Sequence, residues 1–246
     1  MENASGAGTV PTNPERLAGS VKYYQRHVFV CTGKTGWPAH IDEDGGFCQG
    51  LSEAIAAAGP RLAQAVKVNA CDVPSLGQGT DLLVFPDRVR YLGLGPDDLG
   101  AFVDQCLVGE AGAAPLAHEP LTGRHIFVCV HQERDPRCGG CGPAIADRLG
   151  EALAARNLSG QVQVHRTSHV GGHQYAGNLL IYPEGDWYGL VTPEDVPGIV
   201  EQHLLAGRIV YSHWRGRMGL TQAQESELRT RWQTGATQAV PGPADR

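Results

Sequence analysis

The chain has 246 residues, of which 41% are hydrophobic, so it is long enough to bury one large core or two smaller ones. Its formal charge of −6 argues against a protein that binds nucleic acid by electrostatic attraction. No apolar run approaches the roughly 18 residues of a membrane span, and the first residues, MENASGAG, do not resemble a signal peptide. We therefore expect a soluble cytoplasmic protein, in which seven cysteines indicate metal, cluster or reactive thiols rather than disulfides.

The sequence contains an internal repeat with an offset of 97 or 98 residues. HVFVC returns as HIFVC, LLVFP returns as LLIYP, and YLGLGPDDL returns as YGLVTPEDV. These pairs begin at His27 and His125, at Leu82 and Leu179, and at Tyr91 and Tyr188. The repeat predicts two homologous halves of about one hundred residues each.

Each half has the same predicted order of strands and helices. A short apolar strand is followed by a glycine-rich loop, an amphipathic helix, three further strands and a last helix. The predicted strands are 28–31, 66–69, 82–85 and one at Tyr91, then 126–130, 161–165, 178–182 and one at Tyr188. The second half's first helix is predicted from Pro143 to Arg156, and the last helices begin at Pro96 and Pro193.

This alternation predicts an α/β protein made of two tandem thioredoxin-like domains, each with a four-stranded mixed sheet covered by helices on both faces. We expect a flexible N-terminus at 1–19, domains at 20–118 and 119–211, and a C-terminal helix with a mobile tail at 212–246. A Pro/Ala/Gly linker joins the halves near Gly109 to Pro120. In the last segment, Thr221 and Gln224 are spaced as a capping box for a helix that reaches about Trp232.

The second half contains two thiols and two imidazoles in compact pairs. Cys129 closes the first strand of this half, and Cys138 follows as C-x8-C. His169 and His173 form H-x3-H in the loop before the LLIYP strand, separated by Val-Gly-Gly. Two thiolates and two imidazoles are a complete set of four metal ligands.

Two other interpretations of these residues remain open. A loop histidine is often only a solvated polar side chain, and a buried cysteine often behaves as a small hydrophobic residue. A Cys₂His₂ set also suits Zn²⁺, and spacing alone does not separate zinc from an iron–sulfur cluster.

Longer stretches of the chain resemble a known family. The runs HIFVCVHQERDPRCGGCGPAIADRL, HVGGH, LLIYPEGDWYGLVTPEDVPGIVEQHL and HWRGRMGL are similar to the sucrase/ferredoxin-like family of thioredoxin-like ferredoxins, over roughly residues 20 to 220. The resemblance implies a [2Fe–2S] cluster held by Cys129, Cys138, His169 and His173. It also implies an electron carrier rather than a catalyst, with reduction coupled to protonation of a ligand imidazole.

The first half departs from this pattern. Cys31 matches Cys129, but the next cysteine is Cys48, and by sequence offset the histidine pair is replaced by Cys71 and Ser75. Related single-domain ferredoxins use four cysteines at such places, so the fourth ligand of a second cluster would be Ser75 or His40. We expect this first site to be empty and structural.

Two further functions compete with electron transfer. Cys138-Gly-Gly-Cys141 at a helix start is a possible thiol–disulfide exchange motif, although it leaves both histidines without a role. The other function is a binding module stabilised by zinc. Its partner could dock on Trp214, Arg215 and Arg217, although a packed Trp with solvated arginines is the simpler expectation. The sequence names neither the electron donor nor the acceptor, nor the oligomeric state.

Overall fold

The computed structural model describes residues 17–43, 45–109 and 115–233. Most of the predicted flexible N-terminus and the end of the predicted mobile tail lie outside these residues. None of the described helices combines the length and the hydropathy that a membrane crossing requires.

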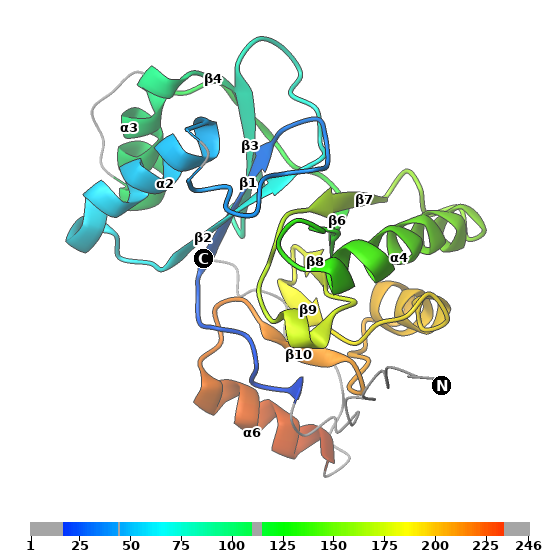
Figure 1. The fold of residues 1–246 in the computed structure, drawn as a ribbon. Helices are drawn as coiled ribbons and strands as arrows, with labels where there is room; N and C mark the ends of the chain where they lie inside the picture. Colours follow the sequence, from blue (N-terminus) through cyan, green and yellow to red (C-terminus); the bar gives the residue numbers. More distant parts are fainter. Residues whose placement is uncertain (1–16, 44, 110–114, 234–246) are drawn as a thin grey trace, which may run out of the picture.

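The described strands form one ten-stranded mixed sheet instead of two separate four-stranded sheets (Figure 1). The strand order is β10-β9-β8-β6-β7-β2-β1-β3-β4-β5. The strands are β1 (Arg26–Cys31), β2 (Val66–Cys71), β3 (Thr80–Phe85), β4 (Val89–Leu94), β5 (His118–Pro120), β6 (Arg124–Cys129), β7 (Val162–Thr167), β8 (Leu179–Tyr182), β9 (Asp186–Tyr188) and β10 (Trp214–Arg217).

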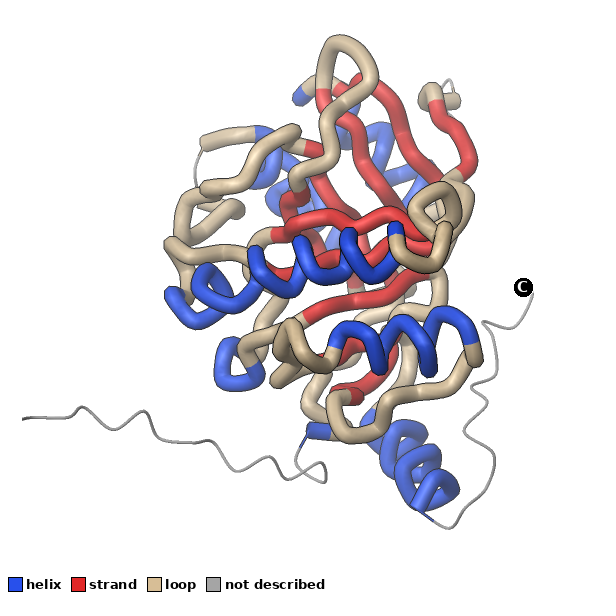
Figure 2. The backbone as a smooth tube through the Cα atoms, turned by 90° about the vertical axis from the view of Figure 1, so that its right-hand side faces the viewer, coloured by secondary structure: helices blue, strands red, loops and turns tan. Residues whose placement is uncertain are grey.

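The two halves of the sheet have matching connectivity. In the first half β1 pairs parallel with β2 and antiparallel with β3, which pairs antiparallel with β4. In the second half β6, β7, β8 and β9 repeat these pairings. The halves join through an antiparallel contact between β2 and β7, where Cys71 lies opposite Thr167. The ten strands, drawn in red in Figure 2, are therefore hydrogen-bonded into one continuous sheet.

The longer helices follow the predicted order with different bounds. They are α2 (Phe47–Ala58), α3 (Leu99–Phe102) continued by the π-helix η3 (Val103–Val108), α4 (Pro136–Ala154), α5 (Val196–Ile199) continued by the π-helix η5 (Val200–Leu205), and α6 (Gln222–Gln233). Short 3₁₀ turns are η1 (Gly59–Arg61), η2 (Pro96–Asp98) and η4 (His173–Tyr175).

Helix α4 begins at Pro136 rather than at Pro143 as predicted. Asp135 caps it, because its carboxylate accepts the backbone N–H of Arg137 at 3.0 Å, and Pro136 suits the first helical position. The segment that contains Cys138 is thus helical, whereas a helix that begins at Pro143 would leave Cys138 outside it.

The helices cover one face of each half-sheet, and the opposite faces of the two half-sheets pack against each other. Phe29 of β1 stacks on Phe127 of β6, with ring centroids 3.7 Å apart. Phe85 of β3 stacks on Tyr182 of β8 at 4.3 Å. The expectation of helices on both faces of each sheet is therefore wrong: on the second face, the other half takes the place of a helix layer.

Segments outside the predicted repeat also join the sheet. Residues 118–120 of the predicted linker form β5 on β4, and residues 214–217 of the predicted C-terminal segment form β10 on β9. The capping box is confirmed, because Thr221 N–H donates to Gln224 Oε1 at 2.9 Å and Gln224 N–H donates to Thr221 Oγ1 at 3.4 Å. Helix α6 follows directly.

Candidate metal centre

The four predicted ligands come from three neighbouring elements of the second half. Cys129 is the last residue of β6, and Cys138 lies in the first turn of α4. His169 and His173 lie in the loop between β7 and β8, where His173 begins η4. This convergence follows from the pairing of β6 with both β7 and β8.

The two thiols are buried and contact each other. Cys129 is 1% exposed and Cys138 is fully buried. The pKa of Cys129 is held well below its usual value, first by the hydrogen bond from Cys138 and then by the His169 side chain and the backbone N–H groups of Val170 and His131. The same pairing raises the pKa of Cys138. The lowered pKa of Cys129 favours its thiolate, which is the form in which cysteine binds metals.

The His169 imidazole lacks a partner for one ring nitrogen. Its Nδ1 atom is buried and has no hydrogen bond to any described residue. The His173 ring lies nearby, with ring centroids 6.2 Å apart, and its side chain is 56% exposed. An unsatisfied buried nitrogen costs about 1–3 kcal/mol, so it is an unusual feature unless a ligand satisfies it. The donor set and this unpaired atom fit a metal centre.

Glycines allow the elements around the centre to approach closely. Gly142 of α4 is packed against the end of β6, where an added Cβ would overlap the carbonyl oxygen of Cys129. Gly172, between the two histidines, has φ +71°, and a Cβ there would overlap the Arg215 guanidinium. A side chain at position 142 would push α4 away from the end of β6, and one at position 172 would strain a left-handed backbone conformation.

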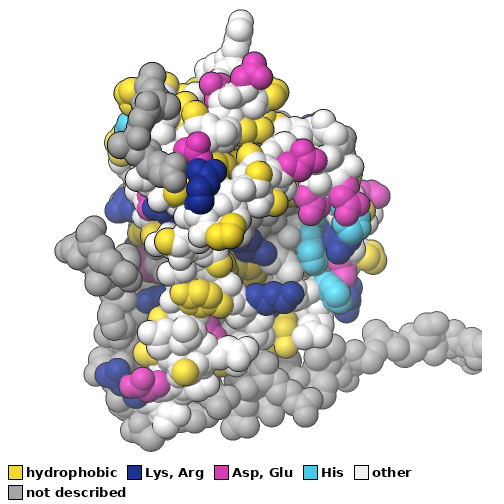
Figure 3. Space-filling model, turned by 90° about the vertical axis from the view of Figure 1, so that its left-hand side faces the viewer, with side chains coloured by type: hydrophobic (Ala, Val, Ile, Leu, Met, Phe, Trp, Pro, Cys, Tyr) yellow, Lys and Arg dark blue, Asp and Glu magenta, His cyan; other side chains and the backbone are white. Residues whose placement is uncertain are grey.

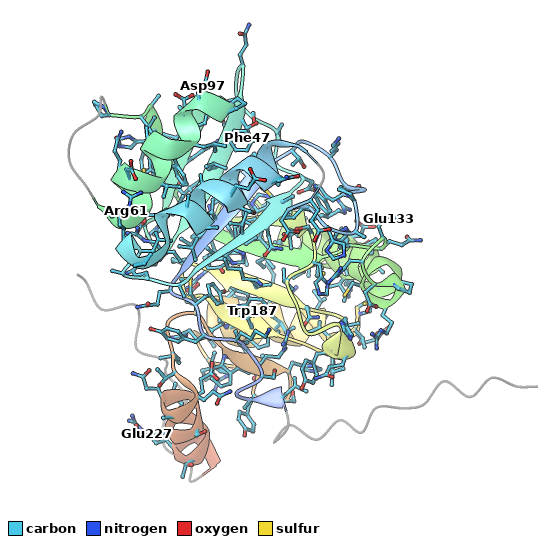
Figure 4. All side chains as sticks on the ribbon, turned by 60° about the vertical axis from the view of Figure 1, so that its left-hand side comes forward. Phe47, Arg61, Asp97, Glu133, Trp187 and Glu227 are labelled. Carbon is cyan, nitrogen blue, oxygen red and sulfur yellow. The ribbon has the colours of Figure 1, made fainter. Side chains whose placement is uncertain are left out.

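A cavity of about 870 Å³ opens beside the two histidines. Both histidines line it, together with Lys67 of β2 and Arg215 of β10. Glu133 and Trp187, which Figure 4 labels, also belong to its lining.

Two of the basic side chains that line the cavity, Lys67 and Arg215, have pKa values that stay above neutral pH. Burial lowers the pKa of Lys67 to about 8 and that of Arg215 to about 10. Arg215 Nη1 donates to Asn178 Oδ1 at 2.6 Å, and its guanidinium carbon lies 4.6 Å from the centroid of the Tyr175 ring. Sequence reasoning missed Lys67, because only the packing of one half on the other brings β2 to this loop.

The arginines expected to be solvated are buried instead. Arg215 is 2% exposed and Arg217 is 9% exposed, next to Trp214 at 1%. Arg217 pairs with Asp186 of β9 at 2.6 Å. These side chains are thus part of the packed interior, which does not suit a docking surface.

The C-x-x-C pair lacks the features of a dithiol catalyst. A reactive thiol needs exposure and a lowered pKa. Cys138 is fully buried, and burial raises the pKa of Cys141. The arrangement therefore suits a ligand and a packed thiol better than thiol–disulfide exchange.

The first half has a smaller cavity at the equivalent edge. Cys31, Cys48 and Ser75 line this cavity of about 430 Å³. Cys71 lies opposite Cys31 in the register of β1 and β2, just as Thr167 lies opposite Cys129. Cys71 is therefore the counterpart of Thr167, so the match of Cys71 and Ser75 to the histidine pair is wrong.

His40 belongs to a separate exposed group. On the face drawn in Figure 3, histidine side chains lie among acidic and basic side chains. The donor atoms of His40, Asp42 and Glu43 lie within 4.8 Å of one another. His40 does not line the cavity of Cys31 and Cys48, so it does not complete a ligand set there.

The chain is similar to several known proteins. It is 40% identical to altered inheritance of mitochondria protein 32 of Meyerozyma guilliermondii over 156 residues, which cover 54% of this chain and 55% of that protein. It is 37% identical to a ferredoxin named "Ferredoxin, 2Fe-2S" of Clostridium pasteurianum over 91 residues, which cover 35% of this chain and 89% of the ferredoxin. The chain thus spans about half the length of the yeast protein.

A solved structure and a family model complete these similarities. A thioredoxin-like [2Fe–2S] ferredoxin from Aquifex aeolicus is 28% identical over 38% of this chain and 90% of that chain, with a TM-score of 0.35. The model of the sucrase/ferredoxin-like family matches residues 17–216, which is most of the sequence. The chain therefore belongs to the sucrase/ferredoxin-like family.

Proposed function

We propose that this protein is an electron carrier that holds one [2Fe–2S] cluster in its second half, ligated by Cys129, Cys138, His169 and His173. The observation that carries the proposal is the buried, unpaired Nδ1 atom of His169 beside a pair of buried thiols, one of which has a pKa below its usual value. Membership of the family and the alignment with nearly all of a ferredoxin named for a 2Fe-2S centre support it.

The related proteins, rather than the ligand spacing, favour a two-iron cluster over one zinc ion. Two thiolates and two imidazoles also form a complete zinc set. The chain aligns with 89% of a ferredoxin named "Ferredoxin, 2Fe-2S" at 37% identity. In the proposed cluster, two thiolates would bind one iron and two imidazoles the other.

When bound, the cluster would supply reversible one-electron chemistry. The residues of the chain hold it, tune it and limit the access of water. Cys129 and Cys138 provide buried sulfur ligands, while Lys67 and Arg215 place positive charge where reduction adds negative charge. The side chain of His173 is 56% exposed, so this ligand would connect the site to solvent.

The architecture is part of the same proposal. We infer that the matched strand orders of the two halves reflect a duplicated thioredoxin-like domain, of which only the second binds a cluster. A cytoplasmic location, with redox proteins as electron donor and acceptor, completes the proposed function.

Metal analysis of anaerobically purified protein tests the proposal. We expect visible absorption bands with about two irons and two sulfides per chain. Stoichiometric zinc without visible bands would refute the electron carrier. About four irons and four sulfides would refute the single site, because the Cys31 and Cys48 cavity would then also be occupied.

A further inference from the structure

Both peptide groups of the proposed ligand His169 are held by buried side chains from outside its loop. The N–H of His169 donates to His131 Nδ1 at 3.0 Å. The carbonyl oxygen of His169 accepts a hydrogen bond from Asn69 Nδ2 at 2.9 Å. Asn69 and His131 are each 2% exposed. The backbone of the ligand is therefore fixed on both sides, although the glycines that follow Val170 give the loop little stiffness of its own.

The hydrogen bond to the carbonyl oxygen of His169 is the last in a series of hydrogen bonds between buried side chains, and this series includes residues of the first half. Asn69 of β2 uses its amide N–H groups for His169 O and for Ser168 Oγ at 3.0 Å, so its Oδ1 atom can only accept. It accepts from His27 Nε2 at 2.9 Å. Burial holds the pKa of His27 well below its usual value, so the ring is neutral and carries its single proton on Nε2.

The remaining hydrogen bonds of this series determine which atom donates in each bond. His27 Nδ1 must accept, and it does so from the Tyr182 hydroxyl at 2.6 Å. The Tyr182 oxygen accepts from the Tyr24 hydroxyl at 3.0 Å, which in turn accepts from Trp187 Nε1 at 2.6 Å. A flipped Asn69 amide would set its oxygen against the carbonyl of His169, so the chain has one arrangement only.

The N–H group of His169 is also linked to the first half, through the His131 side chain. Because His131 Nδ1 accepts from His169, its proton is on Nε2, which donates to the carbonyl oxygen of Trp37 at 3.0 Å. The Trp37 ring meets the His131 ring edge to face, with centroids 5.9 Å apart. The first half therefore reaches the backbone of His169 by two independent routes, through β2 and through the loop after β1.

We propose that the first half serves as a positioning domain for the ligand His169, with Asn69 as the positioning residue. This inference rests on the proposed function and deepens it, because it gives the first half a role that needs no cluster of its own. Asn69 touches neither metal nor substrate; it sets the position of the loop from which the imidazole projects.

Two variants separate positioning from general packing. Asn69→Asp keeps the oxygen that accepts from His27 but replaces the amide that donates to His169 with a second oxygen. Tyr24→Phe is the matched control, because it removes a hydroxyl from the same buried chain and leaves the bonds from His27 to His169 intact. Asn69→Ser, which is too short to reach the carbonyl and adds no charge, serves if Asn69→Asp folds poorly.

The first readout uses the cluster-loaded full chain. For Asn69→Asp we expect cluster release about five to ten times faster than in the wild type, the effect of about one lost hydrogen bond. We also expect broadened nitrogen hyperfine couplings of the ligand imidazoles in pulsed EPR of the reduced protein. Tyr24→Phe should match the wild type in both. Identical couplings and release rates in Asn69→Asp and the wild type, or equal changes in both variants, would overturn the positioning role.

A second readout keeps this test separate from the proposed function. Imidazole ¹⁵N NMR of His169 in the metal-free protein should give one set of resonances for the wild type and Tyr24→Phe, and a broadened or doubled set for Asn69→Asp. If purified wild type holds zinc and no sulfide, the electron carrier is refuted, while this comparison still decides the positioning of His169. Unchanged His169 resonances in Asn69→Asp would overturn it whichever metal is bound.

Discussion

Replacing Gly142 by alanine should separate the two proposed cysteine ligands. Gly142 lies one turn after Cys138 in α4, and an added Cβ would overlap the carbonyl oxygen of Cys129 at the end of β6. Because the obstacle is backbone and not a flexible side chain, the start of α4 has to move away from the strand. Overpacking of this kind costs about 1–3 kcal/mol. Cys138 moves with the helix, so cluster retention should fall as well.

Gly140→Ala in the same helix is the matched control. Its Cβ would meet nothing within 4 Å, so this variant gains only the helix propensity of alanine, about 1 kcal/mol. Both variants share that gain, so the difference between their free energies of unfolding gives the cost of the overlap. Urea unfolding of the metal-free proteins by circular dichroism measures this difference, and iron analysis measures retention. A Gly142→Ala protein as stable and as iron-rich as Gly140→Ala would refute the close approach of α4 to Cys129.

Three further predictions concern single side chains. Cys138→Ser should abolish or severely weaken cluster retention, whereas Cys141→Ser should leave the visible spectrum nearly unchanged; insulin-reduction activity lost in both variants would favour a dithiol enzyme. Lys67→Met removes a cation beside the centre and should lower the reduction potential by tens of millivolts, in order of magnitude, in protein-film voltammetry; an unchanged potential would contradict the electrostatic role. Burial raises the pKa of the Glu225 carboxyl from 4.5 to about 7, so the native state binds more protons than the unfolded chain across this window, and stability should fall as pH rises. The free energy of unfolding should fall less between pH 5 and pH 8 in Glu225→Gln than in the wild type, by about 1–3 kcal/mol. Urea unfolding midpoints at the two pH values measure this difference.

The repeated strands were predictable because their pattern is local. The apolar runs that begin near Val28 and Ile126 form β1 and β6, and the runs that end before Pro86 and Pro183 form β3 and β8. The beginning of α4 was missed because its three glycines at 139, 140 and 142 suggest a loop. The signal for the true start was nonetheless present, since Asp135 followed by Pro136 is a typical N-cap and first helical residue.

The contacts between the halves could not be predicted from local patterns. The pairing of β2 with β7 places Asn69 beside the His169 loop, and nothing in the residues of β2 indicates that neighbour. The same holds for Lys67, which enters the cavity only because the aromatic faces of the two halves meet. The four candidate ligands were found by residue type and spacing, whereas the side chains that surround them depend on long-range packing.

The short outer strands β5 and β10 bear on how this sheet avoids growing by adding strands from other molecules. A long, regular edge strand offers unpaired N–H and C=O groups and promotes aggregation. Here β5 has three residues and ends at Pro120, which has no N–H to offer. At the other edge, β10 has four residues, an irregular register between Trp214 and Gly216, and two buried arginines. Both edges of the described sheet are thus poor templates for intermolecular β-pairing, and removing either strand would expose a neighbour, β4 or β9, to it.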